Sequence, residues 1–195
     1  MPNRRKFVAG ISMFAAMPAV AQSRTTALLA AARRQVGVTL RYDPLYTRLN
    51  FPGGDVRSDR GVCCDVIIRA YRDAFGLDLQ ALVNADMRRA FRSYPRLWGL
   101  SQPDHNIDHR RVPNLETFLQ RQGATRPVPQ NGFDWEPGDI FTSRIGGRLP
   151  HIGFVSDRKG ARSWMVIQNI GAGTREEDAL LDNPLAGRFR WKLFS

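Results

Sequence analysis

The sequence has very few cysteines and no hydrophobic stretch long enough to cross a membrane. Only two of its 195 residues are cysteine, and these two, Cys63 and Cys64, are adjacent. An ordinary disulfide needs Cα atoms about 4.4–6.8 Å apart, whereas adjacent residues are held about 3.8 Å apart across a trans peptide. A disulfide framework is therefore excluded, and at least one thiol is expected to be free. No segment approaches the roughly 18 apolar residues of a membrane-spanning helix, so no span is expected.

The sequence also lacks any cluster of basic residues interleaved with aromatics, a pattern typical of nucleic-acid-binding segments. The formal net charge is +11 at pH 7, but nearly all basic residues are arginine and they are scattered along the chain. Nucleic acid is therefore not expected as a partner. The surplus charge could attract anionic polymers or lipid head groups of a cell envelope, although a solvated basic surface is the simpler interpretation.

The N-terminus, residues 1–21, has the organisation of an export signal. Arg4-Arg5-Lys6 forms a positive start, residues 7–17 form an apolar stretch too short to span a bilayer, and Ala19-Val20-Ala21 fits a cleavage site. The Arg4-Arg5 pair also resembles a twin-arginine signal, so the general and the twin-arginine export routes both remain open. We expect a signal peptide at 1–21, a periplasmic protein, and a single domain at 22–195.

The mature chain divides into a helical half followed by a strand half. Apolar spacing and helix-ending glycines predict helices over 25–36, 63–75, 78–91 and 114–122. Asp78 and Asn114 are the expected N-caps of the last two. Apolar runs separated by turn residues predict strands over 138–143, 151–157, 163–170 and 188–194. Helices followed by an antiparallel meander indicate an α+β domain, with the helices packed on the sheet.

The predicted helix over 63–75 begins with the two cysteines. The amide dipoles at a helix start lower a thiol pKa from about 8.5 toward about 3.5–7.5, which favours the reactive thiolate. One of the two thiols is thus a candidate nucleophile. The alternative is that both are small buried hydrophobic residues, the usual situation of a free cysteine.

The order of the candidate chemical groups resembles that of papain-like hydrolases. A cysteine opens a core helix, a histidine opens a strand, and a polar amide ends the next strand. Segments 135–140 (WEPGDI) and 151–155 (HIGFV) resemble strands of NlpC-type cell-wall cysteine peptidases. The chain resembles even more closely a bacterial family of unknown function typified by YijF. This resemblance extends from Tyr42 to the C-terminus and includes segments 59–63 (DRGVC), 107–115 (IDHRRVPNL) and 169–173 (NIGAG).

The resemblance implies a papain-like, NlpC-type fold and three catalytic roles. Cys63 occupies the nucleophile position, and Cys64, where the family is expected to carry Thr, is interpreted as a packing residue. His151 is the candidate base that deprotonates Cys63 and later protonates the leaving amine. Gln168 stands where the family is expected to carry His, and its amide would orient the imidazole. Asn169, the next residue, is a rival for this third role.

Four further residues are candidate substrate ligands. Asp55 and Asp59 flank the nucleophile, and a carboxylate there could bind a substrate amine, although capping the helix is the commoner role. Asp108 and His109 belong to a segment that either lines the cleft or braces it. No metal site is expected, because the adjacent cysteines lack the usual spacing of zinc ligands, and no cofactor is predicted.

Together these features predict an exported cysteine peptidase or amidase that cleaves an amide through an acyl-thioester. The expected substrate and partner is peptidoglycan stem peptide, or another envelope peptide or amide, a choice that follows from the export signal and the resemblance. The alternative is a catalytically inactive wall-binding module of the same fold. A thiol redox protein is disfavoured because the C-x-x-C spacing is absent. The oligomeric state is not predicted.

Overall fold

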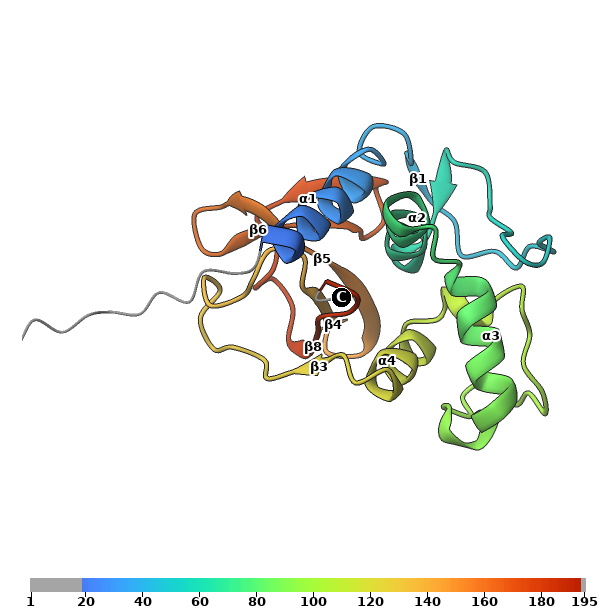
Figure 1. Cartoon of the computed structure of the whole chain (residues 1–195). Helices are drawn as coiled ribbons and strands as arrows, with labels where there is room; N and C mark the ends of the chain where they lie inside the picture. The colour runs from blue at the N-terminus through green and yellow to red at the C-terminus, as the bar shows by residue number, and fades with distance from the viewer. Residues whose placement is uncertain (1–18, 194–195) are drawn as a thin grey trace, which may run out of the picture.

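The computed structural model describes residues 19–193, in which helices precede a large sheet (Figure 1). The helical elements are α1 (Ala19–Arg33), α2 (Cys63–Phe75), α3 (Leu79–Ala90), the 3₁₀ turn η1 (Phe91–Ser93), the 3₁₀ turn η2 (Asp108–Arg110) and α4 (Val112–Arg121). The strands are β1 (Arg41–Tyr42), β2 (Arg60–Gly61), β3 (Thr125–Arg126), β4 (Ile140–Ile145), β5 (Leu149–Lys159), β6 (Trp164–Asn169), β7 (Thr174–Glu177) and β8 (Leu185–Phe189). The mixed α+β architecture predicted from the sequence is thereby confirmed.

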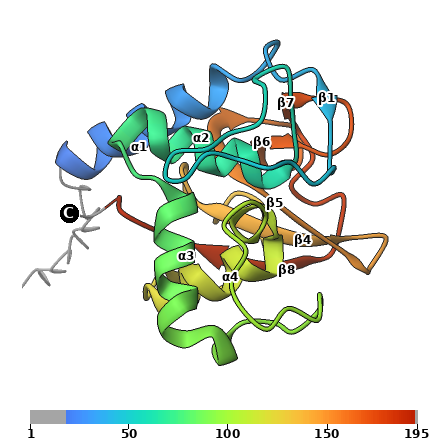
Figure 2. The same cartoon turned by 90° about the vertical axis from the view of Figure 1, so that its right-hand side faces the viewer.

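The main sheet has the strand order β3-β8-β4-β5-β6-β7, and its neighbouring strands are antiparallel. Strands β1 and β2 form a separate parallel pair. Helix α2 contacts β5 and β6, while α1 contacts both α2 and β5, and Figure 2 shows these two helices beside the sheet. Because β2 leads directly into α2, the β1–β2 pair positions the chain just before Cys63.

The sheet buries apolar side chains on both faces, because successive residues of a strand point to opposite sides. Ile140 and Ile167 belong to the main core beneath the helices. Their neighbours Phe141 and Val166 belong to a second, smaller cluster around Trp135. The central strands are therefore covered on both faces, which fixes the register of β4, β5 and β6.

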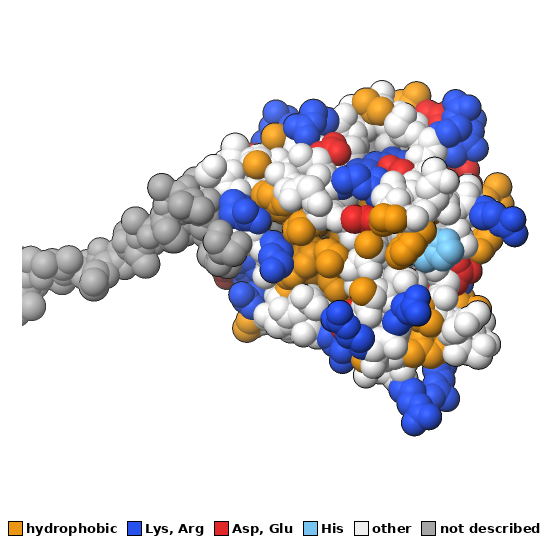
Figure 3. All heavy atoms as spheres, turned by 45° about the vertical axis from the view of Figure 1, so that its right-hand side comes forward, with side chains coloured by type: hydrophobic (Ala, Val, Ile, Leu, Met, Phe, Trp, Pro, Cys, Tyr) orange, Lys and Arg blue, Asp and Glu red, His pale blue; other side chains and the backbone are white. Residues whose placement is uncertain are grey.

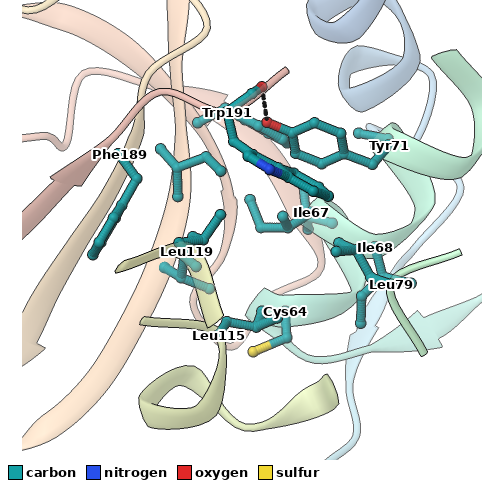
Figure 4. Close-up of a cluster of buried hydrophobic side chains, with 14 of the residues drawn as sticks. Cys64, Ile67, Ile68, Tyr71, Leu79, Leu115, Leu119, Phe189 and Trp191 are labelled. Atoms are coloured by element: carbon teal, nitrogen blue, oxygen red, sulfur yellow. Dashed lines mark hydrogen bonds between the residues drawn. The ribbon is translucent and has the colours of Figure 1, made fainter. Parts of the chain in front are cut away.

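The C-terminal end of the described chain is hydrogen-bonded to α2, the helix that carries the cysteines. The Tyr71 hydroxyl, on α2, donates a hydrogen bond of 2.9 Å to the backbone carbonyl of Trp191 (Figure 4). The two rings also pack together, with centroids 4.9 Å apart. This contact braces α2 from the C-terminal side.

Local signals around α2 and α3 behave as the sequence predicts. Helix α2 spans the predicted residues 63–75, and Gly76 ends it in the left-handed conformation with a φ of 67°. Asp78 caps α3, since its side chain accepts a hydrogen bond of 3.0 Å from the backbone N–H of Gln80.

Several predicted boundaries were wrong, including those of β4 and β5, which span Ile140–Ile145 and Leu149–Lys159 instead of 138–143 and 151–157. Helix α1 covers Ala19–Arg33 instead of 25–36. Helix α4 begins at Val112, so Asn114 lies inside it, fully buried, and donates a 3.1 Å hydrogen bond to the Asp108 carbonyl instead of capping the helix. Strand β8 spans Leu185–Phe189, whereas the sequence predicted a strand over 188–194. The chain is not extended at Lys192, which has a φ of 56°, and residue 194 lies outside the described residues.

The predicted signal peptide is largely beyond reach of the structure, because residues 1–18 lie outside the described part. Within residues 19–193, no helix combines the length and the apolar character needed to cross a bilayer. Figure 3 shows Lys and Arg side chains distributed over the visible face among hydrophobic and acidic ones, without one dominant basic patch.

Candidate active site

Cys63, the first residue of α2, lies at an open cleft with a volume of about 550 Å³. The cysteine is 3% exposed, so it forms part of the cleft floor. The aromatic and charged residues that line the cleft are Tyr42, Tyr46, Trp98, Arg110 and Arg111, and the other lining residues are aliphatic or proline. A nucleophile at this position is reachable by a substrate that fills the cleft.

The segment before Cys63 is held by two hydrogen bonds. The Asp65 carboxylate accepts a hydrogen bond of 2.6 Å from the Val62 N–H and so caps α2 from inside its first turn. A Cβ on Gly61 would lie 2.8 Å from Oδ2 of Asp65, which explains why glycine precedes the cap. Asn169 donates a 3.0 Å hydrogen bond to the Gly61 carbonyl. Asn169 therefore secures the approach to the nucleophile, and its amide nitrogen points to Gly61.

Gln168, and not Asn169, is hydrogen-bonded to His151. The distance from His151 Nε2 to Gln168 Oε1 is 2.8 Å, and Gln168 Nε2 donates a 2.9 Å bond to Oε1 of Glu177 on β7. A carboxylate only accepts hydrogen bonds here, so it fixes which end of the Gln168 amide faces the imidazole. Glu177 was missed in the sequence, because nothing in its polar surroundings signals a strand.

Glycine at position 153 makes room for this arrangement. A Cβ there would lie 2.7 Å from the ring of Phe141 and 3.1 Å from Cβ of Gln168. The Phe141 ring in turn packs on the His151 ring, with centroids 6.0 Å apart. The glycine of the HIGFV segment thus lets Phe141 and Gln168 close on the imidazole from neighbouring strands.

The two thiols have opposite electrostatic surroundings. The hydrogen bond with Cys64 is the largest influence that holds the pKa of Cys63 well below its usual range, and the hydrogen bond and charge of His151 act in the same direction against the effect of burial. Burial raises the pKa of Cys64 well above its usual range. Cys64 is fully buried in the main core, as Figure 4 shows. These directions favour Cys63 as the nucleophile and Cys64, which is buried in the core, as a packing residue.

Tyr42 is a second residue that sequence reasoning missed. It lines the cleft and lies close enough to Cys63 for the two side chains to influence each other's protonation. Burial, followed by the charge of Cys63, raises the pKa of the Tyr42 phenol, so the hydroxyl stays protonated at neutral pH. A two-residue strand gives no periodic signal, and only the pairing of β1 with β2 brings Tyr42 to the nucleophile.

Neither aspartate proposed to bind substrate lies in the lining of the cleft. Asp55 forms an ion pair of 2.9 Å with Arg69 on α2. Asp59 pairs with Arg41 at 2.9 Å, and the hydrogen bond from this arginine is the largest effect that lowers the pKa of Asp59 to about 2. Both carboxylates are used within the fold, because each already has an arginine partner.

Asp108 and His109 both lie outside the lining of the cleft. Asp108 accepts hydrogen bonds of 2.6 Å from the backbone N–H of Asp104 and 3.0 Å from Arg111. His109 is 2% exposed, and burial lowers its pKa to about 4. Of the two alternatives for this segment, bracing describes Asp108, while His109 is buried and the arginines of the segment reach the lining. Within residues 19–193 no three His, Cys, Asp or Glu side chains gather as metal ligands.

Comparison with known proteins agrees with the signature segments around this site. Residues 29–191 match the family described as "Domain of unknown function (DUF1287)". The chain is also 49% identical over 180 residues to "Uncharacterized protein YijF" of Escherichia coli (strain K12), a match that covers 89% of this chain and 86% of the relative. This chain therefore belongs to the DUF1287 family of unknown function.

Proposed function

We propose that this protein is a papain-like cysteine hydrolase that cleaves an amide bond through an acyl-thioester. The observation that carries the proposal is the interacting series of Cys63, His151 and Gln168 at an open cleft. These groups supply a thiolate, a base and an orienting amide, which is the set that nucleophilic catalysis by cysteine requires. The low pKa of Cys63 supports the same role.

In the proposed reaction the Cys63 thiolate attacks the carbonyl carbon of the amide. The amide dipoles at the start of α2 favour the negative charge of the tetrahedral oxyanion. When this intermediate collapses, the C–N bond breaks and His151 gives its proton to the leaving amine. Water then attacks the thioester while His151 takes its proton. The second collapse breaks the C–S bond, releases a carboxylic acid, and restores the thiolate and the imidazolium.

The hydrogen bonds of His151 suit this exchange of protons. Because Gln168 presents its oxygen to Nε2, the proton of the neutral imidazole resides on Nε2. Nδ1 is then the nitrogen that exchanges a proton with Cys63 and with the leaving group. Glu177 maintains this tautomer indirectly, since it holds the Gln168 amide in the required orientation.

We propose peptidoglycan stem peptide, met in the periplasm, as the substrate. The export pattern at 1–21 and the resemblance of segments 135–140 and 151–155 to cell-wall peptidases support this choice. The test is to incubate purified sacculi or soluble muropeptides with the protein and with its Cys63→Ser variant, and to analyse products by mass spectrometry. With the parent protein only, we expect new pairs of peptide fragments whose masses sum to that of the uncleaved muropeptide plus one water. Equal product profiles for both proteins would contradict the proposal.

A catalytically inactive wall-binding module remains the alternative, favoured by the low exposure of Cys63. Such a module would sediment with sacculi without releasing fragments, and an electrophilic thiol probe would label it slowly at neutral pH. The hydrolase is expected to react rapidly with the same probe. Rapid labelling confined to Cys63 therefore separates the two functions.

Glu177 offers a test of the hydrogen-bonded series. In Glu177→Gln the new amide can donate or accept, so Gln168 is free to turn its nitrogen toward His151. We expect alkylation of Cys63 at neutral pH to slow by about three- to tenfold, since one hydrogen bond is worth about 0.5–1.5 kcal/mol. The measurement is the alkylation rate constant, with Glu116→Gln as control because Glu116 pairs with Arg144 outside the series. An equal rate in the two variants would remove Glu177 from the series.

A further inference from the structure

We infer that the cleft contains a carboxylate-binding subsite formed by Arg111 on Trp98, beside the nucleophile. This inference rests on the proposed function, and it names the substrate class: a peptide or acylated amino acid that carries a free carboxylate close to the cleaved amide. The sequence had suggested aspartates that bind an amine. The charge of the cleft is of the opposite sign.

The lining of the cleft contains two guanidinium groups and no carboxylate. Two arginines, Arg110 and Arg111, contribute to it, and among the described residues that line it none is Asp or Glu. The remaining lining is apolar or aromatic, for example Leu97, Ile107 and Val112. Such a surface accommodates the aliphatic part of a peptide and attracts an anionic group.

Arg110 does not provide the subsite, because its guanidinium is already saturated. It forms a two-pronged ion pair with Asp65, with both N–O distances at 2.9 Å. Its remaining hydrogen bonds reach the carbonyls of Asp43 and Leu45 at 3.3 and 3.5 Å. The side chain is 2% exposed, so it serves the fold.

Arg111 is held rigidly, yet one edge of its guanidinium is unused. Its Cζ lies 4.0 Å from the centroid of the Trp98 ring, and Nη1 donates a 3.0 Å bond to Asp108. Among residues 19–193, Asp108 is the hydrogen-bond partner of the Arg111 side chain. The edge of the guanidinium formed by Nε and Nη2 is therefore available to a ligand. A planar edge with two parallel N–H groups matches a carboxylate.

The Asp108 side chain that holds Arg111 is itself held in place. The Asp108 side chain is 2% exposed and also accepts the backbone N–H of Asp104 at 2.6 Å. The guanidinium is therefore braced on one edge by a buried carboxylate and on one face by an indole. Binding to such a preorganised arginine requires little further ordering of the side chain, which favours affinity for a small anion.

The test uses two small alkylating reagents that differ in charge. Iodoacetate is anionic and iodoacetamide is neutral, and both transfer a carbon to the Cys63 sulfur with loss of iodide. We will compare the ratio of their rate constants at Cys63, assigned by peptide mapping, in the parent protein and in Arg111→Gln. Loss of the subsite is expected to lower the iodoacetate-to-iodoacetamide ratio by about tenfold or more, as expected for charge-assisted hydrogen bonds.

The control is Arg121→Gln, because Arg121, at the other end of α4, also pairs with an aspartate, Asp86, but does not line the cleft. Its ratio is expected to equal that of the parent. If Arg111→Gln does not fold, as judged by circular dichroism, Trp98→Leu provides the same measurement and is expected to lower the ratio as well. An unchanged ratio in the folded variant overturns the subsite. Failure of the proposed hydrolase gives a different result, in which His151→Ala leaves both rates unaltered.

Discussion

In a His151→Ala variant, alkylation of Cys63 at neutral pH is expected to slow by about ten- to thirtyfold. The hydrogen bond and charge of His151 help to hold the Cys63 pKa well below its usual range, which increases the thiolate fraction of the parent protein at neutral pH. Without them the Cys64 side chain still offsets burial, so the pKa rises toward the ordinary value of about 8.5, at which only about 3% of a thiol is ionised at pH 7. The loss of thiolate sets the size of the effect.

The sign of this effect predicts a characteristic pH dependence. The parent rate should stay high at neutral pH and fall only in acid, as pH drops through the lowered pKa of Cys63. The variant rate should still be rising in the alkaline range, where the two proteins converge because both thiols are ionised. The measurement is the rate constant against pH, with His105→Ala as control, since His105 stacks on Phe51 and does not line the cleft. Superimposable profiles for parent and His151→Ala would eliminate the proposed mechanism.

Arg110→Met is expected to destabilise the protein by about 3–5 kcal/mol, the usual cost of leaving one partner of a buried ion pair alone. The side chains of Arg110 and Asp65 are 2% and 3% exposed. Their pair joins η2 to the first turn of α2, so the substitution leaves the Asp65 charge buried without its partner. Urea unfolding followed by circular dichroism measures the free energy of unfolding.

The double variant Arg110→Met, Asp65→Asn provides an internal check on the cause. A neutral amide oxygen at position 65 can still accept the Val62 N–H, but it carries no charge, so part of the lost stability should return. Arg162→Met is the matched surface control, because its pair with Asp182 is exposed and should contribute little. A loss in Arg110→Met no larger than in Arg162→Met would mean that solvent reaches Asp65.

The local signals in the sequence located the nucleophile helix and its caps correctly. Gly76 and Asp78 act through their own backbone and their nearest neighbours, so a single sequence is enough to recognise them. Asn114 failed as a cap because Pro113 is well suited to the first turn of a helix, and α4 follows η2 almost directly. Its side chain was then drawn into the core by the carbonyl of Asp108.

The residues that were missed or misplaced depend on long-range pairing. Glu177 reaches Gln168 only because β7 pairs with β6, and the polar run Thr174–Glu177 shows no apolar alternation that would predict a strand. Tyr42 depends on β2 in the same way. Asp59 shows the converse error: it lies close to Cys63 in the chain, but its side chain pairs with Arg41 on β1. Proximity along the sequence was therefore a poor guide to which residues line the cleft.

The alternation of side chains along β7 also constrains how this family can change during evolution. Glu176 accepts hydrogen bonds from Arg33 on α1 at 2.7 Å and from Arg158 at 2.9 Å, while its neighbour Glu177 serves Gln168 on the other face. Inserting or deleting one residue in β7 would exchange the two faces and break both sets of contacts together. Changes in length are thus expected in the segment after β7, from residue 178 to 184, while the strand itself keeps its length.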